Sequence, residues 1–217
     1  MAMKKSFKKS QNVLLLFALI HMALYWPTDA IAYLTVGESA EIMPASEYRF
    51  GFEPQLFINQ GGGGNLGAYF DAQVSESSSV RAGINSGKVD FNLFGSYKYI
   101  PFPDVDKQPA LGFRFGAGYS RLESDNLFLL QFTPLMSKKT SSIERLGDTV
   151  PYFALPFTYT SGKSESYVAS NLTFGLEITP SERNTLYWNM EISFNLNRSY
   201  SYISGAVIIP IDSRRRP

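Results

Sequence analysis

Charged side chains that could do chemistry recur along much of the chain, each flanked by apolar or aromatic neighbours. Because acids and bases are interspersed, the set could pair internally, line a pore that selects solutes, or supply an acid and a base to a reaction. The mixture of signs favours internal pairing. The candidate residues are Arg49, Glu53, Asp71, Arg81, Asp90, Lys98, Arg114, Glu177 and Glu191.

Other reactive side chains are scarce. The chain has no cysteine, and its one histidine, His21, lies among the first 32 residues. Without a thiol there is no disulfide, thiolate metal site or lipoprotein anchor, and a serine nucleophile beyond position 32 lacks its usual histidine base. A carboxylate pair such as Glu177 and Glu191 could do acid–base work, but we assign it a structural role. We therefore expect no enzyme activity, no metal site and no cofactor.

The N-terminal 32 residues follow the order basic, apolar, small. Lysines gather within the first nine residues, an uncharged and mostly apolar run covers 13–26, and Ala30-Ile31-Ala32 closes the segment. This order predicts a secretory signal peptide over residues 1–32, cleaved after Ala32. A transmembrane anchor is the rival interpretation, but the apolar run falls short of the roughly 20 residues that span a bilayer.

The elements that would carry the charged residues are β-strands of about ten residues. In the segments from Tyr167 to Ile178 and from Leu186 to Leu196, mostly apolar residues alternate with polar or small ones. A period of two indicates strands with one apolar face. Less regular copies recur from Tyr48 onward, and we expect ten strands, of which those around 127–136 and 150–157 are the least regular. The breaks are short, which favours antiparallel neighbours.

One hairpin allows the pairing of two inward charges to be estimated. If Ser86-Gly87 is a two-residue loop, Arg81 faces Asn92 across the two strands. Asp90 is then the diagonal neighbour of Arg81, within reach of its long side chain.

Alternation alone does not say whether the apolar face points into a soluble β-fold or outward to lipid. Glycine recurs on the polar face, which suits a crowded and curved lumen. Charged residues make up 18% of the chain, against about a quarter in soluble domains. Tyrosines close several apolar stripes, as in the aromatic girdles of membrane barrels. These are Tyr97, Tyr99, Tyr119, Tyr159, Tyr200 and Tyr202.

With its signal peptide and alternating strands, the chain resembles the small bacterial outer-membrane β-barrel proteins, in pattern and not through a shared motif. The resemblance implies an all-β fold, an antiparallel up-and-down transmembrane β-barrel of about 8–10 strands, in a Gram-negative outer membrane. It implies the lipid bilayer and the outer-membrane assembly machinery as partners, a monomer, and a structural or narrow porin-like role with small solutes. We expect one barrel domain over 33–211 and a basic tail over 212–217.

In such a barrel the inward charges line the lumen and the apolar faces meet lipid. Eight strands leave room only for side chains, and open channels need about sixteen, so we expect a plugged or very narrow barrel. The residues expected to face lipid are Leu172, Phe174, Leu176, Leu186, Trp188, Met190, Ile192 and Phe194.

Two features depart from the usual pattern of these barrels. The two longest breaks, 101–109 and 137–149, fall on the periplasmic side, where short turns are usual, and the last strand does not end on an aromatic residue. The main alternative is a soluble periplasmic all-β ligand-binding protein. The formal net charge of +1 gives no indication of nucleic-acid binding.

Overall fold

The computed structural model describes residues 34–122, 125–140, 142–143, 147–163, 165–181 and 185–212. The expected signal peptide, Tyr33 and the end of the basic tail lie outside these residues. Within the described ranges no helix is long and apolar enough to cross a membrane.

The described chain is built of strands, as its alternating sequence predicts. Their bounds are β1 (Glu47–Phe57), β2 (Gly63–Ser75), β3 (Ser78–Gly87), β4 (Phe91–Phe102), β5 (Ala110–Leu122), β6 (Asp125–Ser137), β7 (Ser142–Ile143), β8 (Gly147–Ala154), β9 (Phe157–Ser161), β10 (Ser166–Ile178), β11 (Tyr187–Asn197) and β12 (Tyr202–Asp212). The last strand therefore includes Asp212, which the sequence places in the tail.

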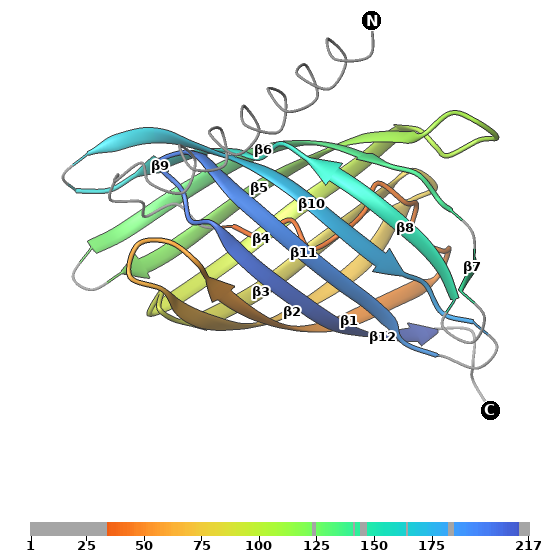
Figure 1. The fold of residues 1–217 in the computed structure, drawn as a ribbon, viewed down its shortest axis with the longest axis horizontal. Helices are drawn as coiled ribbons and strands as arrows, with labels where there is room; N and C mark the ends of the chain where they lie inside the picture. Colours follow the sequence, from red (N-terminus) through yellow and green to blue (C-terminus); the bar gives the residue numbers. More distant parts are fainter. Residues whose placement is uncertain are drawn as a thin grey trace, which may run out of the picture.

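The strands close into an antiparallel barrel, seen from the side in Figure 1. Neighbours in the chain pair in turn from β1 to β6, β10 pairs with β11, β11 with β12, and β12 returns to β1. The strands β8 and β9 occupy one position, because each pairs with β6 on one side and β10 on the other. Leu155 and Pro156 separate these two strands, as expected of a proline that has no amide to donate.

The wall therefore has ten strand positions among the described residues, and the expected antiparallel barrel is confirmed. The small strand β7 pairs only with β8, outside the wall. The ladder between β1 and β12 skips the positions around Pro54, again where a donor is lacking.

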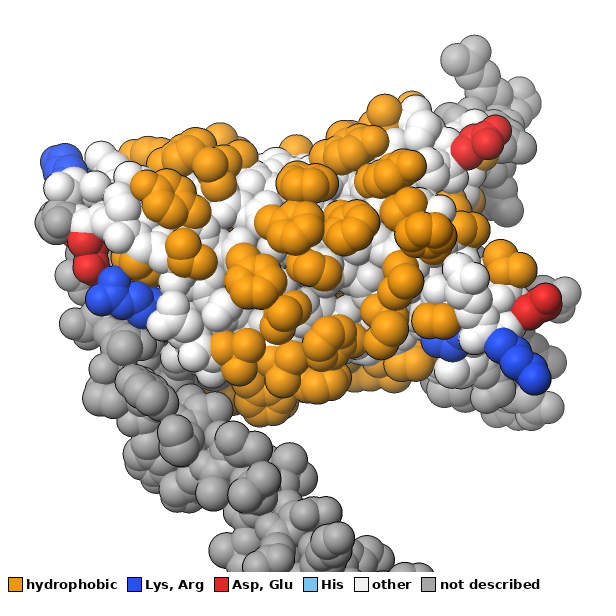
Figure 2. All heavy atoms as spheres, turned by 90° about the horizontal axis from the view of Figure 1, so that it is seen from above, with side chains coloured by type: hydrophobic (Ala, Val, Ile, Leu, Met, Phe, Trp, Pro, Cys, Tyr) orange, Lys and Arg blue, Asp and Glu red, His pale blue; other side chains and the backbone are white. Residues whose placement is uncertain are grey.

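The apolar faces of the strands point outward. Large apolar residues such as Phe52, Phe115 and Ile203 are about half exposed, whereas the polar residues between them are buried inside. Figure 2 shows apolar side chains covering the middle of one face of the barrel, with charged side chains near its two ends. This is the polarity of a transmembrane barrel and the reverse of a soluble one.

The two ends of the barrel differ. At one, here called the loop end, β1 begins and β12 ends, and the connection over 103–109 and the residues 138–140 that follow β6 lie there. At the other, the turn end, β1 joins β2 and β11 joins β12. Tyr97 and Tyr99 face outward near the loop end, and Tyr119 and Tyr159 near the turn end. The prediction was wrong for Tyr200 and Tyr202, which are buried.

Aromatic rings cover glycines on the inner wall. A Cβ atom added to Gly175 would lie 2.0 Å from the ring of Tyr152, its cross-strand neighbour, and one added to Gly51 would lie 2.2 Å from Tyr69. A ring laid over glycine fills the space left by the missing side chain and fixes the register of the pair. The inward glycines thus have a packing role.

We predict that Gly175→Val destabilises the barrel by about 1–3 kcal/mol, because Tyr152 must leave its place. Gly95→Val makes the same substitution on the outward face of β4 and is the control, since its added Cβ would find its nearest atom at 3.8 Å, and we expect a change below about 0.5 kcal/mol. Urea unfolding in lipid vesicles, followed by Trp188 fluorescence, measures both. Equal losses would contradict the packing role.

Candidate functional site

A stretch of chain before the first strand lies inside the barrel. We call residues 34–43 the inner segment; it appears as the red and orange trace within the wall in Figure 1. Residues 34–40 are all buried although none of them belongs to a strand. The segment passes from contacts in the middle of the lumen to the loop end, where β1 begins.

Cationic and amide side chains of β3 to β6 bind the carbonyl groups of the inner segment. Arg114 donates to the carbonyls of Thr35 and Val36, each at 2.7 Å. Arg81 donates to those of Val36 and Gly37, each at 3.3 Å. Lys98 Nζ donates to the carbonyls of Ser39 and Glu41, each at 3.1 Å. The side-chain amide of Gln131 on β6 donates to the carbonyl of Leu34, also at 3.1 Å.

Acidic side chains on the opposite wall accept from the amide groups. Glu191 on β11 accepts from the amides of Val36 at 3.4 Å and Gly37 at 2.8 Å. Glu177 on β10 accepts from the amide of Ser39 at 3.1 Å. An unpaired backbone group buried away from water is costly, and here the wall satisfies several. The two halves of the lumen therefore have complementary roles toward one extended chain.

Glu38 is an ion-pair partner that the inner segment supplies to the wall. One of its oxygens lies 3.0 Å from Lys98 Nζ and the other 3.4 Å from Arg114 Nε. Lys98 and Arg114 directly oppose each other across β4 and β5, and like charges in that position are destabilising. Placed between them, the Glu38 carboxylate removes the repulsion.

Gly37 passes the most crowded point of the lumen. A Cβ atom there would lie 3.2 Å from Arg81 Nη1 and 3.4 Å from Glu53 Oε2. Its φ of +56° is also a conformation that β-branched residues adopt only with strain. Both features require glycine at this position.

Apolar side chains of the inner segment pack against inward rings and aliphatic groups. Leu34 joins a buried cluster with Tyr69, Phe94 and Leu129. Val36 and Ala40 join a second cluster that includes Tyr152. The segment therefore fills lumen space by packing as well as by hydrogen bonds.

The turn end is filled by the connection between β11 and β12, which folds inward. Tyr200 is buried, its ring centroid lies 4.6 Å from that of Phe57, and its carbonyl accepts from Asn171 at 2.8 Å. The neighbouring Ser201 amide donates to Asn59 Oδ1 at 2.9 Å. This inward connection explains why Tyr200 does not belong to the outer girdle. Tyr202 is the first residue of β12 and lies on its inward face, where its hydroxyl donates to Glu191.

At the loop end a cavity of about 670 Å³ opens, with both charge signs in its lining. Arg49 lies 3.9 Å from the centroid of the Tyr187 ring and contacts Glu47 at 2.7 Å and Glu177 at 3.6 Å. Arg49 is thus the shared partner of Glu47, Glu177 and the Tyr187 ring.

Two loops at this end are joined by charged contacts, here called the loop latch. Lys138 contacts the Asp104 carboxylate, and the Lys139 amide donates to Asp104 Oδ2 at 2.7 Å. Burial raises the pKa of Asp104, but its hydrogen bonds with Lys138 and Lys139 and their charges hold that pKa below its usual 3.8. A hydrogen bond to Asp148 raises the pKa of Lys139, against the effect of burial.

The structure places eight of the nine expected charges on the inner wall. Arg81 forms a two-pronged ion pair with Asp71, at 2.6 and 2.9 Å, and Glu191 accepts from Tyr152 at 2.6 Å and also from Tyr202. The eight are Arg49, Glu53, Asp71, Arg81, Lys98, Arg114, Glu177 and Glu191.

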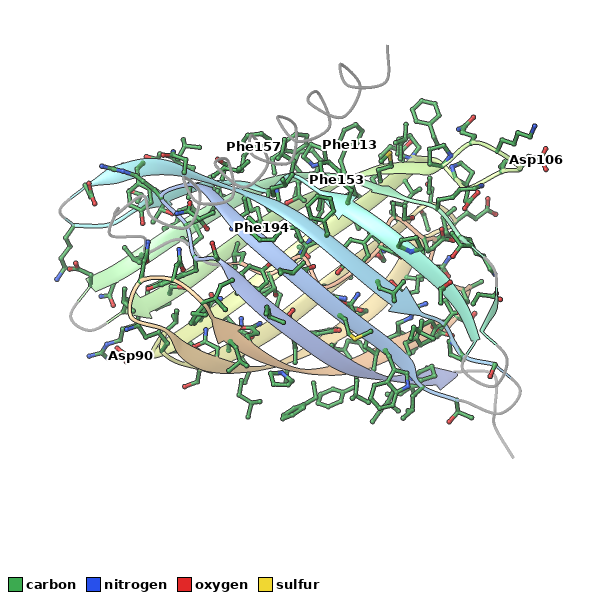
Figure 3. The ribbon with its side chains drawn as sticks, viewed as in Figure 1. Asp90, Asp106, Phe113, Phe153, Phe157 and Phe194 are labelled. Carbon is green, nitrogen blue, oxygen red and sulfur yellow. The ribbon has the colours of Figure 1, made fainter. Side chains whose placement is uncertain are left out.

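The prediction for Asp90 was wrong. Asp90 is exposed in the connection between β3 and β4, at the turn end (Figure 3). Residues 88–90 connect the two strands, and the last pair of their ladder is Asn85 with Asn92. The turn is therefore longer than the assumed two residues, and Arg81 faces Ser96 and not Asn92.

Most residues expected to meet lipid lie on outward faces. Phe174, Trp188 and Met190 are exposed, and Phe194 is seen among the outward rings in Figure 3. Leu186 precedes β11 and is not part of the wall. The half-buried members of the outward faces are Leu172, Leu176, Ile192 and Phe194.

Sequence reasoning missed the residues of the inner segment, Glu38 above all, and the wall residue Gln131. The feature that points to Glu38 is the cross-strand pair Lys98 and Arg114, whose ion-pair partner is an acid of the inner segment, and this pairing is known only once the strand register is known. Among the described residues there is no group of three or more acidic, histidine or cysteine side chains that could hold a metal ion.

No protein-family model matches the chain, and no curated protein sequence matches it. Among solved structures, the chain is similar to the translocator domain of the autotransporter NalP from Neisseria meningitidis, with a TM-score of 0.42 and 11% identity over 95% of this chain and 97% of that one. At these values the likeness carries no functional inference. The barrel rests on the strand pairing above.

The loop latch predicts a pH dependence. Because the folded pKa of Asp104 is lowered, its contacts stabilise the loops at pH values above 3.8 and are lost as the pH falls below that value. We expect hydrogen-exchange protection of the Lys139 amide to fall several-fold on acidification through this range.

The matched variants lie in one loop. Asp104→Asn should remove the pH dependence and most of the protection. Asp106→Asn should keep both, because Lys138 contacts the backbone carbonyl of Asp106 and not its carboxylate. Protection that depends on pH equally in both variants would contradict the assignment.

Proposed function

We propose that this protein is an outer-membrane β-barrel that is closed at rest by its own inner segment. The observation that carries the proposal is the set of hydrogen bonds from both halves of the lumen to the backbone of residues 34–41. The inner segment takes the space through which solutes would pass.

The outward apolar faces support a place in the lipid bilayer. A soluble periplasmic binding protein would have to expose these faces to water, since Phe52, Leu56, Phe115 and Met190 all lie on the outside. Spanning a membrane with strands also satisfies the backbone, because closure leaves no free edge.

The remaining parts of the proposal follow from the sequence. Export through a signal peptide over 1–32 would leave Tyr33 directly before the inner segment. We further propose that the outer-membrane assembly machinery inserts the barrel as a monomer. A structural role in the envelope suits a closed barrel, and a narrow porin-like passage for small solutes requires that the inner segment move.

Planar-bilayer recordings test the proposal on the full-length protein. We expect no steady conductance from the wild type. Glu38→Arg would set a third cation beside Lys98 and Arg114, and an unpaired buried charge costs about 3–5 kcal/mol. We therefore expect the open fraction to rise at least about a hundredfold.

Glu76→Arg makes the same charge change at an exposed turn and should stay closed. Heat-modifiable migration on gels establishes that each variant is folded. Steady conductance of the wild type would contradict closure. A folded Glu38→Arg variant that stays closed would show that the inner segment is not the seal.

A further inference from the structure

The wall binds the inner segment mainly through its backbone. Arg81, Lys98 and Arg114 donate to carbonyls, and Glu177 and Glu191 accept from amides. Backbone groups are the same in every residue but proline. These contacts therefore set a path for an extended chain without specifying most of its side chains.

Side-chain recognition concentrates on one carboxylate. Glu38 meets Lys98 at 3.0 Å and Arg114 at 3.4 Å. Around it the segment has Gly37, Ser39 and Ala40, and the space beside Gly37 does not admit a larger residue without movement. The wall thus selects small residues around one acid.

We propose that the lumen is a binding site for an extended polypeptide with small residues and one carboxylate, and that it can take such a segment from outside the chain when the inner segment is displaced. The proposal rests on the proposed function, in which the inner segment is the seal. Its resident occupant is joined to the wall at the start of β1, and the contacts above do not use that covalent link.

The charges of the wall favour replacement of the inner segment by another chain over a lumen that is left empty. Lys98 and Arg114 oppose each other on neighbouring strands, so loss of Glu38 leaves two cations side by side. An incoming carboxylate restores the pairing, and charge-assisted hydrogen bonds are stronger than neutral ones. Asp71 is held by Arg81, which leaves it unsuited to take the place of Glu38.

The test uses the full-length Glu38→Arg variant and a synthetic peptide with the sequence of residues 34–45, Leu-Thr-Val-Gly-Glu-Ser-Ala-Glu-Ile-Met-Pro-Ala. We expect the peptide to block the conductance of the variant. A peptide with glutamine in place of Glu38 should need about ten- to a hundredfold higher concentration, as expected for loss of a charged hydrogen-bond partner.

Direct binding of a fluorescently labelled peptide, measured by anisotropy, accompanies the recordings. Gly37→Val is a second variant that is expected to displace the inner segment. It leaves Glu38 and every wall residue unchanged. The Glu76→Arg barrel, with its lumen occupied, should bind neither peptide.

The outcomes separate the two proposals. If either folded variant conducts but the peptide neither blocks nor binds, the peptide site is overturned and closure by the inner segment stands. If both peptides act equally, recognition of the carboxylate is overturned. If neither variant conducts and neither binds peptide, both proposals fail. If a variant binds peptide but does not conduct, only the proposal that the inner segment closes the barrel is overturned.

Discussion

The arrangement of the lumen depends on one electrostatic constraint, the pair of cations that β4 and β5 place opposite each other. Lys98 and Arg114 point inward, are buried, and meet the carboxylate of Glu38 from the inner segment. A buried charge is tolerated when it is paired and hydrogen-bonded. Because the partner, Glu38, belongs to the inner segment and not to a strand of the wall, the barrel and the segment within it form one electrostatic unit.

The size of the barrel explains why a segment fits. An eight-stranded barrel has an interior just wide enough for its own side chains, and the diameter grows roughly linearly with strand number. Ten positions give somewhat more room, and inward glycines such as Gly51 and Gly175 are filled by Tyr69 and Tyr152. The remaining space accommodates an extended chain, whose backbone the wall must satisfy because little water can reach it.

Much of the fold could be predicted from the sequence, because alternation identifies the strands and separates the apolar face of each from its polar face. The direction of the apolar face was inferred from the placement of glycine and aromatic residues and from the low share of charged residues. The error at Asp90 has a simple cause: alternation continues through Val89 and does not mark where the turn from β3 to β4 lies. The prediction for Tyr200 was wrong because the connection before β12 folds inward. Alternation within a strand gives no information about the path of a connection.

The inner segment could not be predicted in the same way. Its role depends on carbonyl and amide groups, which carry no sequence signal, and its side chains from Val36 to Ala40 show no period that requires a strand. Glu38 is one acid among many until the register places Lys98 against Arg114. Such a contact between distant parts of the chain is visible only once the wall is closed.

The most direct test of the central claim is disulfide trapping, which is clean because the chain has no cysteine. A Cβ atom at Gly118 would lie 3.3 Å from Leu34 Cδ2 on the inside of β5, whereas Tyr119 points outward. With Leu34→Cys, a cysteine at position 118 should form a disulfide in the membrane-inserted protein, and one at position 119 should not. A missing cross-link at 118, or equal cross-linking at both positions, would contradict the place of the inner segment in the lumen.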